Sequence, residues 1–339
     1  WMDADDTIPE ECGRRLRDLV LLAEDRVAGF ILQVHCPSAP GESGLTVVDH
    51  VKLFRNRPEH RFEGRIHEQI LEALCRSGGE VRRTDLHVVH SGYDHSPEGQ
   101  RKKRERDLRL LQLDLADRPN HPFVLFNIGM TAFHLRDFER ATQALEQCLA
   151  LSNPRESTVR KVFAMLAACS LEQGDLDTAR SRVEEGLGRF PADPELLFRA
   201  GMIYHASGDL PSAERCYLKL LTEREVGHID SLDVSMTSFR AHHNLAVILQ
   251  EMGRLGEAEQ EFRAAILADP KEPGRILDLA RFLARRGRFE ESDAEFAKAD
   301  KLAPSSPKVI YAKAETYIET RRRLPEARQL LEQYRKANL

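Results

Sequence analysis

The sequence lacks any long apolar run, and none of its apolar stretches approaches the roughly 20 residues that a helix needs to cross a bilayer. Hydrophobic residues make up 41% of the 339 residues and charged residues 31%, which is the balance of a soluble protein. An excess of positive charge is also missing, because the net charge is −5. We therefore expect neither a membrane span nor nucleic-acid binding.

Paired cysteine motifs are absent as well. The six cysteines show no CxxC or CxxH spacing; they are Cys12, Cys36, Cys75, Cys148, Cys169 and Cys216. This scatter predicts small core residues in a reduced, cytoplasmic protein. No signal peptide is visible, and the sequence begins with Trp1 rather than Met, which indicates a fragment of a longer protein.

What the sequence does contain is a repeat with a period near 34 residues, between about 119 and 339. A small residue is followed twelve positions later by another small residue and four positions later by an aromatic. The three clearest copies are Gly201–Ala213–Tyr217, Ala246–Ala258–Phe262 and Ala280–Ser292–Phe296. Such a period predicts a helix, a tight turn and a second helix in each copy, with small residues where two helices cross.

Six copies can be placed, at about 119–154, 158–191, 194–224, 239–270, 273–304 and 307–339. Most inner turns carry Gly, which favours a left-handed helix cap. An insert at about 225–238 is expected to be a loop, and Arg321–Arg323 replaces the last turn glycine, which predicts an irregular final turn. This pattern resembles the tetratricopeptide repeat (TPR) family, and the resemblance implies a superhelix with a groove for a peptide or protein.

Polar residues on the first helices are the candidates for lining this groove. They are Asn127, Arg199, His242, His243, Asn244 and Asp278. Each could equally be an ordinary solvated residue, and the array could serve only as a scaffold that supports or dimerises its neighbour. The adjacent histidines His242 and His243 should point to different faces of a helix, which argues against a shared metal.

The N-terminal segment concentrates acidic residues before a predicted helix. Asp3 and Asp5 alternate with Ala4, so an extended backbone would point both carboxylates the same way. Oxygen ligands in this arrangement suit Mg²⁺ or Mn²⁺ holding a diphosphate. The alternative is a simple helix cap, because Thr7 and Glu10 have the spacing of a capping box.

Strand-like runs follow this helix. The runs 28–36 and 45–54 predict a hairpin, 70–75 a short helix and 85–93 a third strand. The basic stretch 101–106 then opens a helix that leads into the repeats. It reads either as a solvated helix face or as a region that attracts phosphate.

The motif order within residues 1–115 carries a second resemblance. Asp-Ala-Asp-Asp, a hairpin, Leu-Phe-Arg-Asn, Gly-Arg-Ile-His-Glu and His-Ser-Gly-Tyr, followed by repeats, is similar to the second half of a bacterial-type family-2 glycosyltransferase. The implied fold is an α+β remnant of a GT-A α/β domain at 1–115, followed by an all-α TPR superhelix at 119–339. The nucleotide-binding half, which normally precedes the acidic motif in this family, is absent.

The same resemblance assigns roles to residues. Asp5, Asp3 and His90 would hold a divalent metal, Mn²⁺ or Mg²⁺, and Asp3, Arg65 and His90 would contact the donor diphosphate. Glu68 would be the base that deprotonates the acceptor in an inverting reaction, with His67 as the other candidate. As alternatives, Arg65 and Glu68 could form a surface ion pair, and His90 could be an ordinary strand-end histidine.

Two functions follow from these observations. The parent protein would be a family-2 glycosyltransferase that moves a sugar from a nucleotide-sugar donor to an acceptor, with the repeats binding the acceptor or a partner protein. The present chain alone would then be inactive. The alternative function is a non-catalytic TPR adaptor for protein–protein interaction.

Overall fold

The structure is a computed structural model that describes residues 1–38, 45–91, 96–154, 156–222 and 232–337. It contains two compact units. Of the described residues, the first unit comprises those within 1–38, 45–208 and 232–234, and the second those within 209–222 and 235–337. The sheet and the first repeats therefore share one unit, while the predicted division at 115–119, which follows sequence motifs, stays a prediction.

A five-stranded sheet with the order β1-β4-β2-β3-β5 forms the N-terminal part of the first unit. β2 (Val27–Pro37) and β3 (Leu45–Phe54) pair antiparallel, which confirms the predicted hairpin. β4 (Glu80–His90) runs parallel to β2, and the short β1 (Asp6–Thr7) pairs with β4. The third strand was predicted to reach residue 93, but 92–95 lie outside the described residues.

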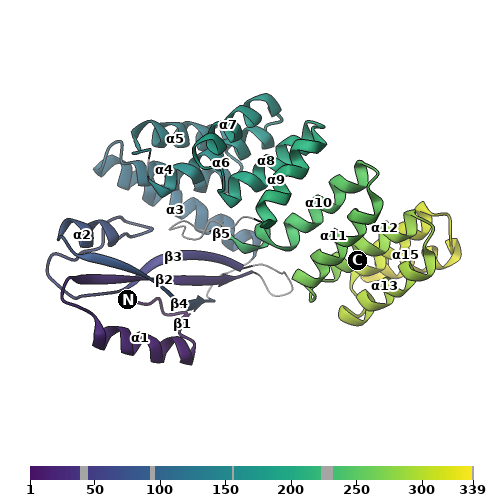
Figure 1. Cartoon of the computed structure of the whole chain (residues 1–339), viewed down its shortest axis with the longest axis horizontal. Coiled ribbons are helices and arrows are strands. Elements are labelled where there is room, and N and C mark those ends of the chain that lie inside the picture. Colours follow the sequence, from purple (N-terminus) through teal and green to yellow (C-terminus); the bar gives the residue numbers. More distant parts are fainter. Residues whose placement is uncertain (39–44, 92–95, 155, 223–231, 338–339) are drawn as a thin grey trace. The chain divides into compact units, whose positions relative to one another are not determined.

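Helices cover both faces of this sheet (Figure 1). α1 (Glu10–Leu22) covers one face, where Phe30, Leu32 and Val34 are buried together with Cys12. α2 (Leu71–Arg76) covers the other, against Ala28, Ile31 and Val51. Because side chains alternate along a strand, one nearly apolar strand can fill two cores. This explains why the run at 28–36 is almost continuously hydrophobic.

The start of α1 differs from the predicted capping box. Pro9 is the N-cap and no side chain caps the helix, while Glu10 and Glu11 occupy the first turn. Thr7 lies in β1 instead, where its hydroxyl donates to the Val89 carbonyl at 3.4 Å. Pairing with β4 thus takes Thr7 away from the helix, and the prediction of a Thr7–Glu10 capping box is wrong.

Two helices are present in each of the six predicted copies. α3 (Pro97–Asp117) precedes them, and the helices of the successive copies are α4 (Pro122–His134) and α5 (Phe138–Leu151), α6 (Ser157–Glu172) and α7 (Leu176–Arg189), α8 (Pro194–Ala206) and α9 (Leu210–Thr222), α10 (Phe239–Glu251) and α11 (Leu255–Ala268), α12 (Pro273–Arg285) and α13 (Phe289–Leu302), and α14 (Pro307–Glu319) and α15 (Leu324–Ala337). Gly129 shows why small residues recur at the crossings. A Cβ there would lie 2.5 Å from Cγ of Leu145.

The turns inside the pairs are also as predicted. Gly174, Gly208, Gly253 and Gly287 adopt φ between 74° and 78°, the left-handed region that favours glycine. In the last pair Arg321 and Arg323 have φ of 53° and 46° instead, so this turn is irregular.

The insert between the third and fourth pairs ends in a short strand and a 3₁₀ helix rather than in a loop. Residues 223–231 lie outside the described part, but β5 (Leu232–Asp233) pairs with β3 and a 3₁₀ helix follows at Val234–Thr237. Asp233 aligns with Thr46, so the array contributes the last strand of the N-terminal sheet. The prediction of a loop as far as 238 is wrong for residues 232–237.

Among the described residues, no helix is long and apolar enough to span a membrane. Four of the six cysteines are buried, namely Cys12, Cys148, Cys169 and Cys216, which fits the predicted core role. Cys75 is exposed.

Candidate functional site

Asp3, Asp6 and His90 come together at the edge of the sheet. One potential ligand atom from each of these residues lies within 4.8 Å of the other two, and this is the one such group of three or more among the described residues. The partners come from opposite ends of the N-terminal region. β1 aligns Asp6 directly with His90 of β4, and Nδ1 of His90 lies 2.9 Å from Oδ1 of Asp6.

The site includes Asp6, which sequence reasoning had not selected. The backbone turns after Asp3, with the Asp6 amide donating to the Asp3 carbonyl at 3.1 Å, so the predicted extended alignment of Asp3 with Asp5 is wrong. Asp5 still lies close, with Oδ1 3.5 Å from Nδ1 of His90. Asp6 could have been found as the third acid of the Asp-Ala-Asp-Asp motif, and β1 begins at this residue.

Lys52 supplies a buried positive charge beside these acids. Its ammonium lies 2.6 Å from Oδ2 of Asp6 and 3.4 Å from Oδ2 of Asp3. The side chain of Asp6 is 0% exposed and that of Lys52 4%. Burial alone would raise the pKa of Asp6, but hydrogen bonds from Lys52, the Asp3 amide and His90 outweigh it, so the pKa is lowered.

The donor set fits a hard divalent cation in its chemistry and charge. Carboxylate oxygens and one imidazole nitrogen suit Mn²⁺ or Mg²⁺. Three aspartates and Lys52 leave a net charge of −2 when His90 is neutral (−3 + 1), which one divalent ion would balance. Lys52 occupies the Oδ2 side of Asp6, while Oδ1 faces His90.

Aromatic residues and His50 border the same site. The Lys52 ammonium lies 4.2 Å from the centre of the Trp1 ring. The ring of Trp1 packs against that of Phe62, with the ring centres 5.1 Å apart. The rings of His50 and Trp1 are stacked, with their centres 6.3 Å apart. Burial lowers the pKa of His50, and Lys52 and His67 lower it further while Asp3 and Asp6 act in the opposite direction. His50 therefore lies within electrostatic range of both the acidic cluster and His67.

The loop at 63–69 carries the two predicted catalytic residues. Glu63 and Gln69 close it by two backbone hydrogen bonds of 2.9 Å, and Gly64 and His67 adopt φ of 104° and 53°. Glu68 and His67 are both exposed near its tip. A short closed loop of this kind holds the backbone of Glu68 in a fixed place, which a positioned base requires.

Arg65 and Ile66 fasten this loop to the helices that follow the sheet. The Arg65 guanidinium pairs with Asp117 of α3, and its amide lies 3.3 Å from Oδ2 of Asp114. Ile66 packs against a core that includes Leu111 and Val124. The alternative of an Arg65–Glu68 ion pair is therefore wrong, and the predicted diphosphate contact of Arg65 would have to compete with Asp117.

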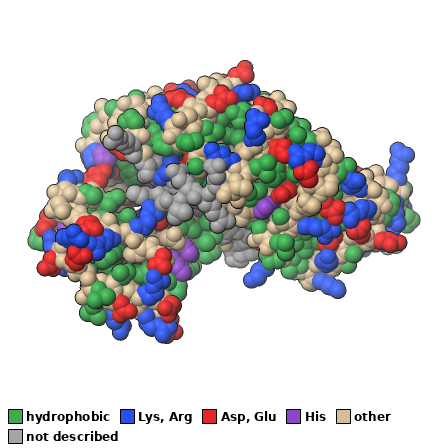
Figure 2. Space-filling view, in the orientation of Figure 1, with side chains coloured by type: hydrophobic (Ala, Val, Ile, Leu, Met, Phe, Trp, Pro, Cys, Tyr) green, Lys and Arg blue, Asp and Glu red, His purple; other side chains and the backbone are tan. Residues whose placement is uncertain are grey.

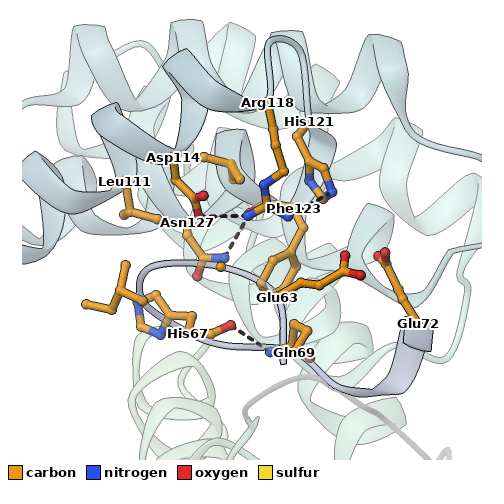
Figure 3. Close-up of a pocket in the computed structure, with 13 residues that line it drawn as sticks. Glu63, His67, Gln69, Glu72, Leu111, Asp114, Arg118, His121, Phe123 and Asn127 are labelled. Carbon is orange, nitrogen blue, oxygen red and sulfur yellow. Dashed lines mark hydrogen bonds and ion pairs between the residues drawn. The ribbon is translucent and has the colours of Figure 1, made fainter. Parts of the chain in front are cut away.

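A small pocket lies between the loop and α3–α4 (Figure 3). Asp114 and Arg118 form a 2.7 Å ion pair in its wall, and Asn127 donates to the Phe123 carbonyl at 2.8 Å. Nδ1 of His121 is buried without a partner among the described residues. The space suits about one water molecule, which His121 could bind. We interpret this pocket as a polar joint between loop and array rather than a substrate site.

The predicted groove residues of the array are mostly engaged within the chain. His242 pairs with Glu261 at 2.7 Å, and His243 lies 3.2 Å from Asp278, so the two histidines do point to different neighbours. Asn244 donates to the Tyr217 hydroxyl at 2.9 Å. Asn127 is buried at the joint just described. These residues hold helices together, which leaves Arg199 as the remaining candidate.

Arg199 belongs to a positively charged region on α3, α4, α6 and α8. Desolvation of the imidazole, followed by the charges of Arg104, Lys161 and Arg199, lowers the pKa of His134 to about 4. Acids lie among these cations. Glu195 pairs with Lys161 and lies 3.6 Å from Arg199, and Asp193 interacts with Lys161 and lies 3.8 Å from Arg160. Among these six groups the cations outnumber the acids by four to two.

Comparison with known proteins identifies the helical repeats. Family models described as tetratricopeptide repeat match residues 124–154, 170–226 and 239–272. The array is built from tetratricopeptide repeats. The described residues among them fall in α4–α11 and the turns around these helices, and none belongs to a strand of the sheet.

Two curated relatives share part of this array. A TPR repeat-containing protein of Synechococcus elongatus is 29% identical over 142 residues, which is 40% of this chain and 35% of the relative. Human tetratricopeptide repeat protein 7A is 24% identical over 151 residues, 44% of this chain and 16% of the relative. The alignments thus span about a third or less of each relative, so they support the repeats and not a shared activity.

Solved structures agree on the fold. The hetero-tetramer Cut9–Hcn1 of the APC/C is similar at a TM-score of 0.51 with 12% identity, over 63% of this chain and 40% of that one. The C-terminal part of a TPR repeat-containing protein from Cytophaga hutchinsonii also has a TM-score of 0.51 with 13% identity, over 70% and 92% of the two chains. At these identities the likeness concerns the fold alone.

Proposed function

We propose that the TPR array of this chain binds a protein partner through an acidic segment of that partner. The observation that carries this proposal is the gathering of Arg104 of α3, Lys161 of α6 and Arg199 of α8 around His134. TPR arrays bind peptides or proteins along their first helices, and Lys161 and Arg199 both lie on first helices, α6 and α8. A carboxylate-rich peptide would complement this surface.

The test is the binding of a fluorescently labelled acidic peptide, with a peptide of equal length and neutral composition for comparison. Binding should weaken as salt rises, because salt screens the attraction between the peptide and these charges. Arg199→Ala and Arg104→Ala should each reduce affinity by about tenfold, the loss expected for one charge-assisted contact.

Arg109→Ala is the matched control, because Arg109 is an exposed arginine on the same helix as Arg104. It should leave affinity unchanged. Equal binding of the acidic and neutral peptides, or an equal loss in all three variants, would contradict the proposed acidic partner.

A second candidate function is favoured by the group formed by Asp3, Asp6 and His90. We propose that a longer protein containing this chain is a family-2-like glycosyltransferase, with this group as its divalent metal site. A bound Mn²⁺ or Mg²⁺ would neutralise the diphosphate of a nucleotide-sugar donor. Support comes from Asp3, Asp5 and His90, the residues that the motif resemblance selected, which gather with Asp6 at one edge of the sheet.

The residues of this chain would divide the work as follows. Asp3, Asp5 and His90 would hold the cation, with Asp6 added to this set by the structure. Glu68, on the closed loop, would accept the proton of the acceptor hydroxyl. Lys52 would keep the carboxylates paired with a positive charge whenever the cation is absent.

This candidate is tested in the natural full-length protein. Mn²⁺ with a nucleotide sugar should raise its melting temperature, and Asp5→Ala should abolish that rise. Glu68→Gln should spare donor binding and stop sugar transfer. If Asp5→Ala and the wild type respond alike, the metal assignment is wrong. If no nucleotide sugar binds at all, the chain is a TPR adaptor without this activity.

A further inference from the structure

Two buried carboxyl groups lie at the start of α8, within the positively charged region around His134. Asp193 is the N-cap of this helix, where it accepts the Leu196 amide at 2.9 Å, and Glu195 lies in the first turn. Their side chains are only 6% and 7% exposed. Because burial disfavours an ionised carboxyl and two neighbouring carboxylates repel each other, both can stay ionised only if enough positive charge lies beside them.

The cations that face these two acids are divided unequally between them. Lys161 of α6 forms an ion pair with Glu195, and Arg199, one turn further along α8, lies 3.6 Å from the same carboxyl. Lys161 also attracts Asp193, but its ammonium is already engaged by Glu195. Arg160 of α6 has its Nε 3.8 Å from Oδ2 of Asp193, too far for a hydrogen bond. Asp193 is therefore the more weakly paired acid and takes up a proton first.

The protonation of Asp193 changes the charge of the region near neutral pH. Burial raises the pKa of Asp193 to about 6, with the charge of Glu195 acting in the same direction and the Leu196 amide and the α6 cations opposing it. The pKa of His134 is lowered to about 4, so this imidazole stays neutral above pH 5. As Asp193 gains its proton, the net charge of the six groups counted above rises from +2 (4 − 2) to +3 (4 − 1).

We propose that the positively charged region binds its acidic segment together with a proton, which Asp193 takes up from solution. This inference rests on the proposed function, because it concerns the same surface. A partner carboxylate that approaches Lys161 draws on the ammonium that Glu195 and Asp193 share, and it adds a negative charge nearby. It therefore raises the pKa of Asp193 further, and by linkage the protonated form binds the acidic segment more tightly.

The test is the affinity for an acidic peptide at about pH 5 and at about pH 7.5. The probe is labelled at its N-terminus and has aspartate, with a pKa of about 3.9, as its only ionisable side chain, so its charge stays constant. Histidines elsewhere in the chain gain charge in this range. The quantity that counts is therefore the difference in pH dependence between the wild type and Asp193→Asn, a variant that keeps the cap.

The wild type should gain about threefold to tenfold more affinity at the lower pH than Asp193→Asn gains, which is the effect of one charge at moderate distance in a partly solvated site. At about pH 7.5, Asp193→Asn should bind the peptide more tightly than the wild type does. Calorimetry near pH 6.5 in two buffers of different ionisation enthalpy measures the proton directly. Binding to the wild type should take up a larger fraction of a proton than binding to Asp193→Asn.

Glu195→Gln tests the shared cation. This change leaves Lys161 to Asp193 alone, so the midpoint of the pH dependence should move to lower pH. An unchanged midpoint would overturn the division of charges described above. If the wild type and Asp193→Asn bind the peptide with the same pH dependence, the proton coupling is wrong while the acidic partner stands. If no variant binds the peptide at either pH, the acidic partner and the coupling are both wrong.

Discussion

Charged residues are organised differently in the array and in the sheet. In the array, several basic residues pair with an acid that lies one repeat period further along the sequence. Lys161 with Glu195, Arg281 with Glu315 and Arg285 with Glu319 are all 34 residues apart. In the sheet, Asp3, Asp5, Asp6, Lys52 and His90 form one cluster that has no counterpart elsewhere among the described residues. Basic and acidic side chains are accordingly interspersed over the visible face of the array (Figure 2).

This difference separates structural charges from functional ones. A pair that recurs with the period is explained by the stacking of repeats, because each repeat contacts only its neighbours. A cluster that occurs once and keeps an excess charge is not explained by stacking. The acidic site of the sheet is one such departure. The basic region around Arg199 is another, because Lys161 there belongs to a periodic pair but Arg104 does not.

The array itself divides in a similar way at its inner turns. Asp137, Asp175 and Asp209 cap the second helices of the first three pairs by accepting a backbone N–H at 3.0–3.2 Å. The last three pairs have arginine there. Arg254, Arg288 and Arg323 each pair with a glutamate three residues ahead and with an acid of the preceding repeat, namely Glu214, Glu259 and Asp293. The last three pairs therefore have ion pairs between repeats at the position where the first three have a helix cap.

The largest effect is expected for Asp6→Asn in the sheet. The change leaves the ammonium of Lys52, whose side chain is 4% exposed, without its nearest carboxylate. Removing one partner of a buried ion pair costs about 3–5 kcal/mol of the free energy of unfolding. Trp1 is the only tryptophan and lies against Lys52, so denaturation followed by its fluorescence reports on this region. Asp25→Asn, at an exposed site, should change nothing.

A smaller effect, and one that raises stability, is expected for Asp193→Asn in the array. Burial raises the pKa of Asp193 to about 6 from 3.8, so the folded state binds a proton that the unfolded state has lost. This carboxyl therefore lowers stability as pH rises from 3.8 to about 6, and the loss persists at neutral pH. Asn can still accept the hydrogen bond from the Leu196 amide, but it carries no buried charge. It should therefore raise the free energy of unfolding by about 1–3 kcal/mol at pH 7.

The pH dependence provides the control for Asp193→Asn. The advantage of Asn over Asp should shrink as pH falls and vanish below the unfolded pKa, where both residues are neutral. An advantage that is equal at acidic and neutral pH would show that the buried charge is not its cause.

Next in size is the loss of one local cap. Asp175→Ala removes the acceptor for the Thr178 amide and should lower the melting temperature by about 2–4 °C. The neighbouring Asp177→Ala, which removes an acid of the same helix turn without removing the cap, is the matched control. The effect of Asp175→Ala should persist at high salt, because a hydrogen bond to the backbone is hardly screened.

The smallest effect is expected for Arg288→Ala. The variant loses ion pairs to Glu259 and Glu291 at the surface, and its melting temperature should fall by less than about 2 °C. In about 1 M salt this difference should disappear through screening. If Arg288→Ala were salt-independent and Asp175→Ala salt-sensitive, the contrast between caps and links would be wrong.

Sequence reasoning located the array well because its signals are local and repeated. Gly129, the turn glycines and the aromatics at Phe262 and Phe296 each occur in register, and the structure places them as the period predicted. The hairpin and the third strand were also predictable from apolar runs.

The acidic site could be predicted only in part, because its geometry depends on pairing between distant segments. Asp3 and His90 were selected, but the partnership of Asp6 with His90 follows from the β1–β4 register, which the sequence does not display. Lys52 was not selected, because nothing in its strand at 45–54 marks it as a partner of the acids. Arg65 was assigned to phosphate, whereas its partner Asp117 is 52 residues away.

The most direct measurement is a Mn²⁺ titration of this chain followed by electron paramagnetic resonance and by quenching of Trp1 fluorescence. The account predicts one site that quenches Trp1 and is lost in both Asp6→Asn and His90→Ala, while Asp25→Asn keeps it. Circular dichroism would verify that the variants remain folded, and His90→Gln offers a milder change at the same position. If the wild-type chain binds no Mn²⁺ near Trp1, or binds it equally well without Asp6 and His90, the sheet cluster is a structural ion-pair network and not a metal site.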